Sequence, residues 1–253
     1  MDMNYIEMDY YTDEDKSFVN SLKEEFVEYK KTDDYLEVFE KESPLVSTIT
    51  CTYNRPKLLM DRCIDSILKQ TYKNIQIVIV GDRCHPDTNK EILDRIEKIG
   101  DDRIIFESFG EFCVRSVERG SDEWKTAGSE AYLRALEIAN GDFITQLDDD
   151  DWYVENRIEI LVKEMKEKKL DLVYHAWSQH GKIFDYGGKI EGGKTGSCVN
   201  MFHKFLKKVG CDPLCAQKYN EPSDINRFMK YIWVGSKYGY VNMPLTHLGL
   251  NNV

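Results

Sequence analysis

The chain has 253 residues, of which 42% are hydrophobic, enough to bury the core of one α/β domain of ordinary size. Its formal net charge of -11 means that the surface as a whole repels nucleic acid and anionic membranes. The seven cysteines have no regular spacing, which disfavours a secreted disulfide framework and indicates a reducing compartment. Residues 1–15 lack the features of a signal peptide, and no stretch reaches the roughly 18 apolar residues of a membrane helix. We therefore expect a cytoplasmic protein with no transmembrane segment and no nucleic-acid partner.

Residues 1–44 are predicted to form a helical N-terminal extension. Four large apolar or aromatic residues recur there at helical spacing, namely Phe18, Leu22, Phe26 and Tyr29. We expect this stripe to pack on the protein's own domain rather than on a partner. A second short helix is predicted to begin at Thr32-Asp33-Asp34, and Ser43-Pro44 ends the helical pattern.

From residue 45 to residue 176, strand and helix patterns alternate. Strands are predicted at 45–50, 75–80, 103–106, 143–147 and 170–176. Amphipathic helices fill most of the intervals, and such alternation implies a parallel sheet with right-handed crossovers. The connection 107–126 is too long for an ordinary crossover and is predicted to line a functional site. This core is expected to bind the ligand.

Beyond residue 176 the pattern loosens, and we expect a smaller lobe over residues 177–253. A glycine-rich segment runs to Gly196. A short helix is predicted over Phe202–Val209 and a longer one over Ser223–Val234.

Four consecutive carboxylates, Asp148 to Asp151, follow the predicted apolar strand at 143–147. Adjacent like charges repel, so a folded chain keeps them together only in water or around a cation. Ligands of open α/β sheets bind at the carboxyl ends of strands, and Mg²⁺ and Mn²⁺ prefer oxygen ligands. The run therefore predicts a hard-cation site beside a phosphate ligand. The alternative is a solvated turn that caps the helix beginning near Val154.

Three motifs occur in a fixed order along the chain. Thr52-Tyr53-Asn54-Arg55-Pro56 follows the first strand, Gly81-Asp82 follows the second, and Asn140 to Ile144 leads into the acidic run. In this order they resemble the GT-A fold glycosyltransferases of family 2, and the likeness covers residues 45 to 250. The resemblance implies an α/β fold with a mostly parallel, Rossmann-like sheet flanked by helices and a small acceptor-side lobe.

The resemblance also implies a nucleotide-sugar donor, Mn²⁺ or Mg²⁺ as cofactor, and inversion at the anomeric carbon. Family positions that contact the nucleotide sugar fall on Cys51, Thr52, Tyr53, Asn54, Arg55, Asp82, Asp148 and Asp149. Those that hold the metal fall on Asp150, with Asp148 beside it, and His247 is a further candidate. UDP-sugars are the commonest family donors. A role in polysaccharide biosynthesis follows, with a glycan, lipid-linked or protein acceptor and the oligomeric state left open.

The catalytic base of such enzymes lies near the start of a helix in the second lobe. Asp224 matches that position best and Glu221 is the fallback, because the spacing departs from the family's common Glu-Asp pair. Asp224 as a simple helix cap is the alternative.

The helix before the acidic strand departs from the family, because many relatives carry an Arg-Asn pair where this chain has Tyr132-Leu133. Lys125 or Arg134 is expected to supply the missing positive charge, with Lys125 preferred for contact with the donor.

Three rival interpretations stay open. Gly188 to Thr195 satisfies the phosphate-loop pattern, but the preceding strand is short and polar and only 58 residues follow from Gly196 to the end. Cys211 and Cys215 with His203 offer a weak zinc site. The third is a non-catalytic sugar-binding protein on the same fold.

Overall fold

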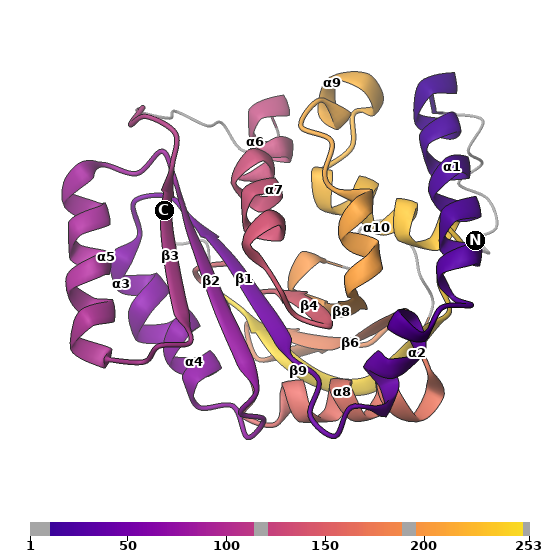
Figure 1. Ribbon diagram of the computed structural model, residues 1–253. Coiled ribbons are helices and arrows are strands. Elements are labelled where there is room, and N and C mark those ends of the chain that lie inside the picture. Colours follow the sequence, from indigo (N-terminus) through magenta and orange to yellow (C-terminus); the bar gives the residue numbers. More distant parts are fainter. Residues whose placement is uncertain (1–10, 114–120, 189–195, 250–253) are drawn as a thin grey trace.

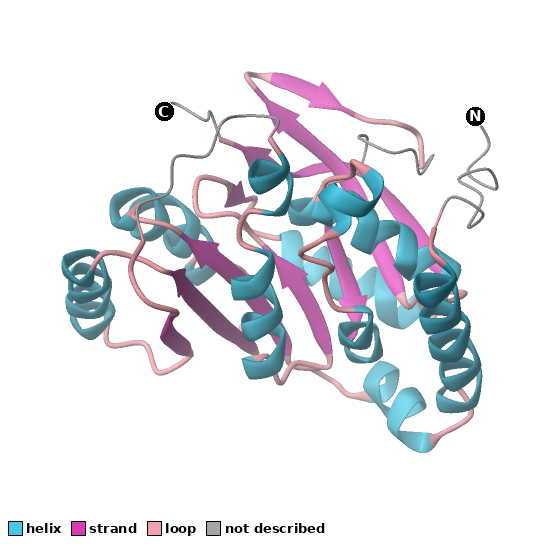
Figure 2. Ribbon diagram, turned by 90° about the horizontal axis from the view of Figure 1, so that it is seen from above, coloured by secondary structure: helices cyan, strands magenta, loops and turns pink. Residues whose placement is uncertain are grey.

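The structure is a computed structural model that describes residues 11–113, 121–188 and 196–249. The described residues form one nine-stranded sheet in the order β3-β2-β1-β4-β8-β6-β9-β5, with β7 paired to β6. Figure 1 shows α7 and α10 above the sheet and α8 beneath it. Seen from above, the strands run between helices across the molecule (Figure 2). The described residues therefore form a layered α/β fold, with helices on both faces of the sheet.

One end of the sheet is parallel throughout. It comprises β1 (Val46–Thr52), β2 (Ile75–Asp82), β3 (Ile104–Phe109) and β4 (Phe143–Gln146). β1 and β2 are almost completely buried, as expected of strands covered by helices on both faces. The four strands predicted in this part, and their parallel pairing, are confirmed.

Four helical segments follow the parallel strands. They are Pro56–Leu68, in which α3 (Pro56–Leu58) and α4 (Asp65–Leu68) flank a π-helical stretch (Leu59–Ile64), then α5 (Pro86–Ile99), α6 (Asp122–Thr126) and α7 (Ser129–Ile138). α5 begins at Pro86, and the His85 ring caps it by accepting the Asp87 N–H at 3.2 Å. Gly141 is required after α7, since a Cβ there would lie 2.5 Å from the Ser47 nitrogen.

The other end of the sheet is mixed. It contains β5 (Trp152–Tyr153), β6 (Leu172–Gln179), β7 (Lys182–Phe184), β8 (Asn200–His203) and β9 (Tyr238–Leu248). β8 runs antiparallel between β4 and β6, so strands from before and after residue 177 share one sheet. The remaining helical segments are α8 (Arg157–Lys168), α9 (Cys215–Tyr219), α10 (Ser223–Trp233) and a 3₁₀ helix (Lys204–Val209).

The predicted helix over Phe202–Val209 is wrong at its start. Phe202 and His203 belong to β8, and the segment turns into the 3₁₀ helix only at Lys204. The His203 ring accepts the Phe205 N–H at 3.1 Å and thus caps that helix. The helix predicted over Ser223–Val234 is confirmed as α10, whereas β9 was not predicted at all.

The N-terminal helices α1 (Asp13–Tyr29) and α2 (Asp33–Glu40) pack on the rest of the chain, as expected. The Phe26 ring stacks on Phe205 with 4.5 Å between centroids, and Lys230 donates to Asp15 at 2.9 Å. Phe18, however, is 41% exposed, and Val19 takes its place in the core. The Thr32 side chain caps α2, as predicted.

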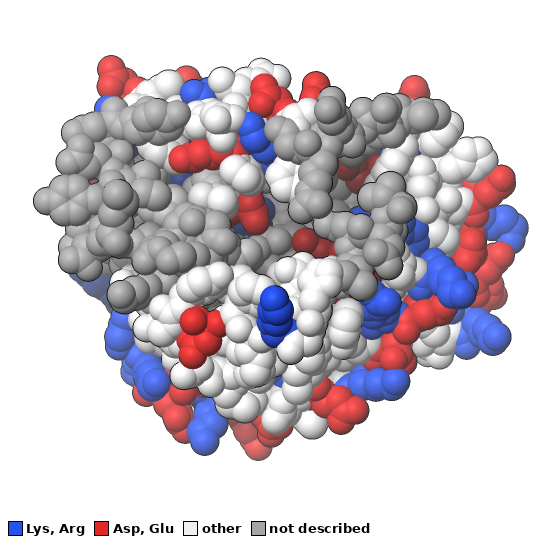
Figure 3. Space-filling view, turned by 180° about the vertical axis from the view of Figure 1, so that it is seen from behind, with Lys and Arg blue, Asp and Glu red and all other residues white. Residues whose placement is uncertain are grey.

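The charged side chains on the surface are distributed as the net charge of -11 suggests. Acidic and basic side chains are interspersed on the described part of the face shown in Figure 3, with no continuous basic patch there. No helix among the described residues is both long and apolar enough to cross a bilayer.

Candidate active site

The acidic run lies where β4 ends, at the carboxyl edge of the parallel strands. Thr52, at the end of β1, donates its hydroxyl to Asp149 at 2.7 Å. Arg55 follows in the next loop and forms ion pairs with Asp149 at 2.7 Å and Asp150 at 2.9 Å. Arg62 donates to the Asp150 carbonyl at 3.1 Å. The motif after β1 thus holds two of the four carboxylates.

The other two carboxylates form a separate group with a cysteine. Ligand atoms of Asp148, Asp151 and Cys198 all lie within 4.8 Å of one another. The Asp148 N–H donates to Cys198 Sγ at 3.2 Å, and the Gly249 N–H donates to Asp151 Oδ1 at 2.7 Å. Burial, followed by repulsion from neighbouring carboxylates, raises the pKa of both Asp148 and Asp151. Two buried carboxylates that repel each other in this way fit a divalent cation, because the cation would offset their repulsion.

These carboxylates open onto a cleft of about 490 Å³. Asp148, Asp150 and Asp151 line one part of it, and Asp224 lines it from the first turn of α10. Burial raises the pKa of Asp224, and nearby Arg227 partly opposes this rise. The cleft therefore combines a candidate cation site with a candidate proton acceptor.

A buried arginine that the sequence did not single out supports this arrangement. Arg227, from α10, donates to the Gln146 side chain at 3.0 Å, and Gln146 donates in turn to Asp148 at 2.9 Å. The Arg227 guanidinium also lies 3.8 Å from the centroid of the Tyr132 ring. Arg227 thus places a buried positive charge one side chain away from Asp148, and the charge role predicted for Lys125 or Arg134 stays a prediction. The sequence predicted the helix that carries Arg227, but its partner Gln146 lies 81 residues away in the chain.

Comparison with known proteins agrees with this geometry. The family described as "Glycosyl transferase family 2" matches residues 47–192, more than half of the chain. The chain belongs to glycosyl transferase family 2. The matched region contains the parallel strands, the acidic run and the β6–β7 hairpin.

Two curated relatives illustrate the likeness of the family 2 chain. It is 35% identical over 131 residues to "Glycosyltransferase GlyG" of Streptococcus pneumoniae, covering 52% of this chain and 38% of that protein. It is 34% identical over 130 residues to the Escherichia coli "UDP-Glc:alpha-D-GlcNAc-diphosphoundecaprenol beta-1,3-glucosyltransferase WfaP", covering 51% and 45%. The chain spans less than half the length of both relatives.

Solved structures show that the expected α/β fold is correct. The S. aureus TarS 1-349 structure in complex with UDP has a TM-score of 0.62 at 14% identity and covers 81% of this chain and 60% of that one. Mannosyltransferase PcManGT from Pyrobaculum calidifontis, in complex with GDP-Man and Mn²⁺, has a TM-score of 0.61 at 14% identity, covering 94% and 69%. At such identity the likeness shows the fold alone.

The structure brings some of the predicted residues of the family 2 chain together and separates others. Asp148 is grouped with Asp151 and Cys198, whereas the Asp150 carboxylate pairs with Arg55. The His247 ring stacks on Trp152 with 5.1 Å between centroids, outside that group. The metal roles predicted for Asp150 and His247 stay predictions, and Asp151 and Cys198 are additions that the structure supplies.

The two candidate bases face different surroundings. Asp224 lines the cleft, while the Glu221 carboxylate accepts from the Tyr11 hydroxyl at 2.5 Å and from Asn226 at 3.1 Å. Glu221 thus belongs to the contact between the N-terminal segment and α10. This placement favours Asp224.

The nucleoside-contacting candidates surround the ends of β1 and β2. Asp82 is buried and ion-paired with Arg83 at 3.1 Å, and the Asn54 side chain accepts the His85 N–H at 2.7 Å. The Tyr53 hydroxyl donates to the Cys113 carbonyl at 2.9 Å, and Cys51 packs against the core. Lys125 is ion-paired with Asp122 at 3.6 Å and does not line the cleft.

The rival sites gain no support from the described residues. In the described part of the chain, His203, Cys211 and Cys215 do not form a group that could hold a metal. Of the phosphate-loop motif, residues 189–195 lie outside the described residues.

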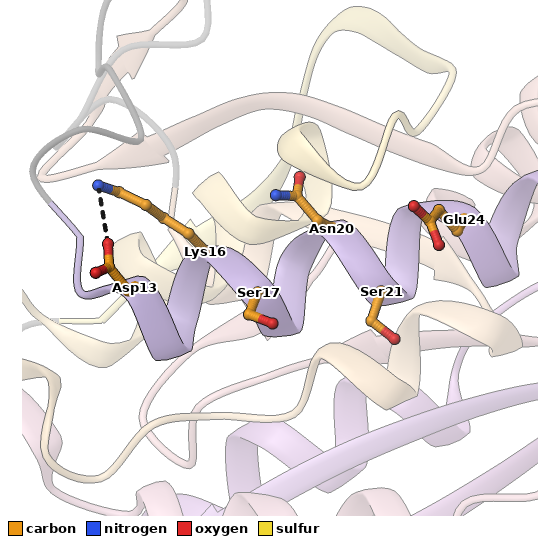
Figure 4. A pocket seen from close by; sticks show the side chains of 6 residues that line it. All are labelled: Asp13, Lys16, Ser17, Asn20, Ser21 and Glu24. Atoms are coloured by element: carbon orange, nitrogen blue, oxygen red, sulfur yellow. Dashed lines mark ion pairs between the residues drawn. The ribbon is translucent and has the colours of Figure 1, made fainter.

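A second hollow, of about 440 Å³, lies along α1 and is shown in Figure 4. All its lining residues come from this one helix, and Lys16 lies 3.9 Å from Asp13 within it. Polar side chains on a solvated helix face explain it, so we assign it no site.

Proposed function

We propose that this chain is a glycosyltransferase that moves a sugar from a nucleoside-diphosphate sugar, preferably a UDP-sugar, to an acceptor hydroxyl with inversion. One observation carries the proposal: Asp224 lines the same cleft as Asp148, Asp150 and Asp151, at the carboxyl edge of the parallel strands. An inverting transfer needs a charge-stabilising site on one side of the anomeric carbon and a base on the other. Family membership and the UDP named in two similar proteins support the donor class.

The carboxylates are proposed to hold Mn²⁺ or Mg²⁺ through Asp148 and Asp151, with Asp150 close by. When bound, such a cation stabilises the negative charge that develops on the diphosphate leaving group. The protein's own contribution is positional. Thr52 and Arg55 fix Asp149 and Asp150, while Gln146 and Arg227 fix Asp148. The Mn²⁺ named with PcManGT supports a divalent ion.

Asp224 is proposed to accept the proton of the attacking acceptor hydroxyl. Its raised pKa makes the carboxylate a stronger base than an exposed aspartate, which is the property that the role requires. Since only one base is needed for inversion, Glu221 has no part in this step. Similar proteins act on lipid-linked glycans by name, so polysaccharide biosynthesis is the proposed setting.

Calorimetric titration of the full chain with UDP, GDP and dTDP, with and without Mn²⁺, tests the proposal. We expect UDP to bind in a Mn²⁺-dependent way and Asp148→Ala to abolish that dependence. Asp94→Ala, on the exposed face of α5, is the matched control and should bind as the unaltered protein does. If no nucleotide binds with Mn²⁺, the transferase proposal is wrong. Binding without hydrolysis or transfer of any UDP-sugar would identify a non-catalytic binding protein instead.

A further inference from the structure

One wall of the cleft is built from aromatic rings that the proposed transfer chemistry does not use. Trp177 of β6 and Phe184 of β7 are directly paired across the hairpin, and their rings stack at 10° with 5.7 Å between centroids. The Tyr186 ring lies 5.4 Å from that of Trp177. Trp124, from the long connection after β3, lines the same cleft and is 42% exposed. Trp177, Phe184 and Tyr186 are partly buried, and rings that line a cleft while still reaching water indicate a surface that a ligand covers.

The position of this aromatic wall separates it from the candidate nucleoside site. The strand order β2-β1-β4-β8-β6 places the acidic run, which follows β4, in the middle. Thr52 and Asp82 end the strands on one side of it, and Trp177 lies on β6 on the other side. A donor with its base beside β1 and β2 and its diphosphate at the acidic run leaves the rings of Trp177, Phe184 and Tyr186 free. Asp224 lines the same cleft as the acidic run and this wall.

We propose that Trp177, Phe184, Tyr186 and Trp124 form the acceptor subsite and that the acceptor presents a sugar ring to it. A pyranose ring has an apolar face of C–H groups, which aromatic faces attract, and an edge of hydroxyl groups. The cleft offers both complements, because aromatic rings stand beside the carboxylates of Asp148, Asp150, Asp151 and Asp224. The inference rests on the proposed function and narrows the acceptor class to saccharides.

Two other occupants fit the cleft less well. An acyl or polyprenyl chain would cover the rings, but it would also desolvate the neighbouring carboxylates without satisfying them. A nucleobase would stack on the rings but would then leave the loop after β1 and Asp82 without a ligand. A saccharide satisfies the aromatic rings and the carboxylates together.

Saturation-transfer NMR with a panel of methyl glycosides tests the inference. The panel comprises the methyl β-glycosides of glucose, galactose and N-acetylglucosamine, each added to the full chain with UDP and Mn²⁺. We expect saturation to concentrate on the ring C–H protons of one sugar face for at least one glycoside. Trp177→Ala and Tyr186→Ala should each weaken that glycoside about three- to tenfold, the usual worth of one aromatic contact. Tyr238→Ala removes a ring that is 47% exposed and lies outside the cleft, so it serves as the control.

The Kd for UDP, measured on the same samples, separates this inference from the proposed function. A matching loss of UDP affinity in Trp177→Ala would assign the rings to the nucleobase and overturn the inference. Glycoside binding that is unaffected by both substitutions, or the absence of binding by all three glycosides, would also overturn it. Failure of UDP itself to bind would instead refute the donor assignment. Circular dichroism of each variant identifies any loss of folding, and Trp177→Phe then replaces Trp177→Ala with a smaller expected loss.

Discussion

The two ends of the sheet contribute different things to the cleft. The parallel end, β3-β2-β1-β4, supplies Thr52, Arg55 and the acidic run from segments close to strand ends. The mixed end supplies Cys198, Asp224 and the rings of Trp177 and Phe184 from a 3₁₀ turn, α10 and the β6–β7 hairpin, whereas Trp124 comes from α6. The first set holds charge at fixed positions, and the second set surrounds the space that an acceptor would enter. We infer that donor chemistry depends on the parallel end and acceptor choice on the mixed end.

The family match ends within the mixed end of the sheet. It covers residues 47–192, which include nearly all of the parallel end and also β5, β6 and β7, but neither β8, β9 nor α10. Loops and short elements that a rigid sheet positions can change without loss of the fold. We therefore expect this chain to differ most from its relatives in β8, β9 and α10, which lie outside the matched residues.

The largest expected effect comes from Asp224, on the mixed side. Asp224→Asn removes the proposed base and should lower kcat for transfer by about 10²- to 10⁴-fold, while the Kd for the UDP-sugar changes little. Radiolabelled transfer and calorimetry measure the two quantities. Glu221→Gln is the matched comparison, because its carboxylate faces Tyr11 and Asn226 rather than the cleft. If Glu221→Gln loses more turnover than Asp224→Asn, the two roles are reversed.

The sequence predicted more of the site at the parallel end of the sheet than at the mixed end. The acidic run and the motif after β1 were predictable, because each lies beside a strand with strong periodicity. Asp224 was singled out through the resemblance to family 2, whose base lies near the start of a helix, and its role stays a prediction. Cys198 and Arg227 were not singled out, since their partners Asp148 and Gln146 lie 50 and 81 residues away in the chain.

The strands of the mixed end were hard to predict for a local reason. β9 pairs with β6 through register shifts around His175 and Ala176, so its residues do not alternate cleanly between faces.

The buried position of Arg157 has no signal in the sequence either. It is fully buried without a carboxylate partner among the described residues, and it donates to the carbonyls of Cys198 and Asn200. Tertiary contacts alone explain its place.

A substitution at Gly141 tests the rigidity of the parallel end. A Cβ at this position would lie 2.5 Å from the Ser47 nitrogen and 2.6 Å from the Phe143 carbonyl oxygen, both backbone atoms. Gly141→Ala should therefore lower the free energy of unfolding by about 2–3 kcal/mol. Urea denaturation followed by fluorescence measures it. Gly196→Ala is the control, since nothing lies within 4 Å of the position that its added Cβ would take, and an equal loss in both would show that crowding is not the cause.

Arg55 tests whether the parallel end stabilises charge as proposed. It pairs with Asp149 and Asp150, so Arg55→Gln leaves both carboxylates without this cation. We expect Mn²⁺ alone to bind several-fold tighter, because the competing Arg55 cation is gone. UDP with Mn²⁺ should bind about tenfold weaker, which is the effect of losing one charge-assisted hydrogen bond to the ligand. Calorimetry measures both constants. Arg95→Gln, a surface arginine paired with Asp61, should change neither. Weaker Mn²⁺ binding in Arg55→Gln would contradict a cation site beside these carboxylates.

The smallest effect concerns the N-terminal segment, which joins the mixed end through α10. Burial of Asp15 acts to raise its pKa, but hydrogen bonds from Tyr219 and Lys230 outweigh this and lower it to about 2. Because the folded pKa lies below the unfolded one, the resulting stability is present above about pH 4 and is lost as the pH falls toward 2.

Asp15→Asn should therefore cost about 1–2 kcal/mol of unfolding free energy at pH 7, and its difference from the unaltered protein should shrink between pH 4 and pH 2. Denaturation at a series of pH values measures this. Asp13→Asn, two residues earlier and fully exposed, should show almost no such difference. A pH-independent loss in Asp15→Asn would mean that packing rather than charge joins α1 to α10. The helix that carries Asp224 would then be positioned by apolar contacts such as those of Tyr11 with Trp233.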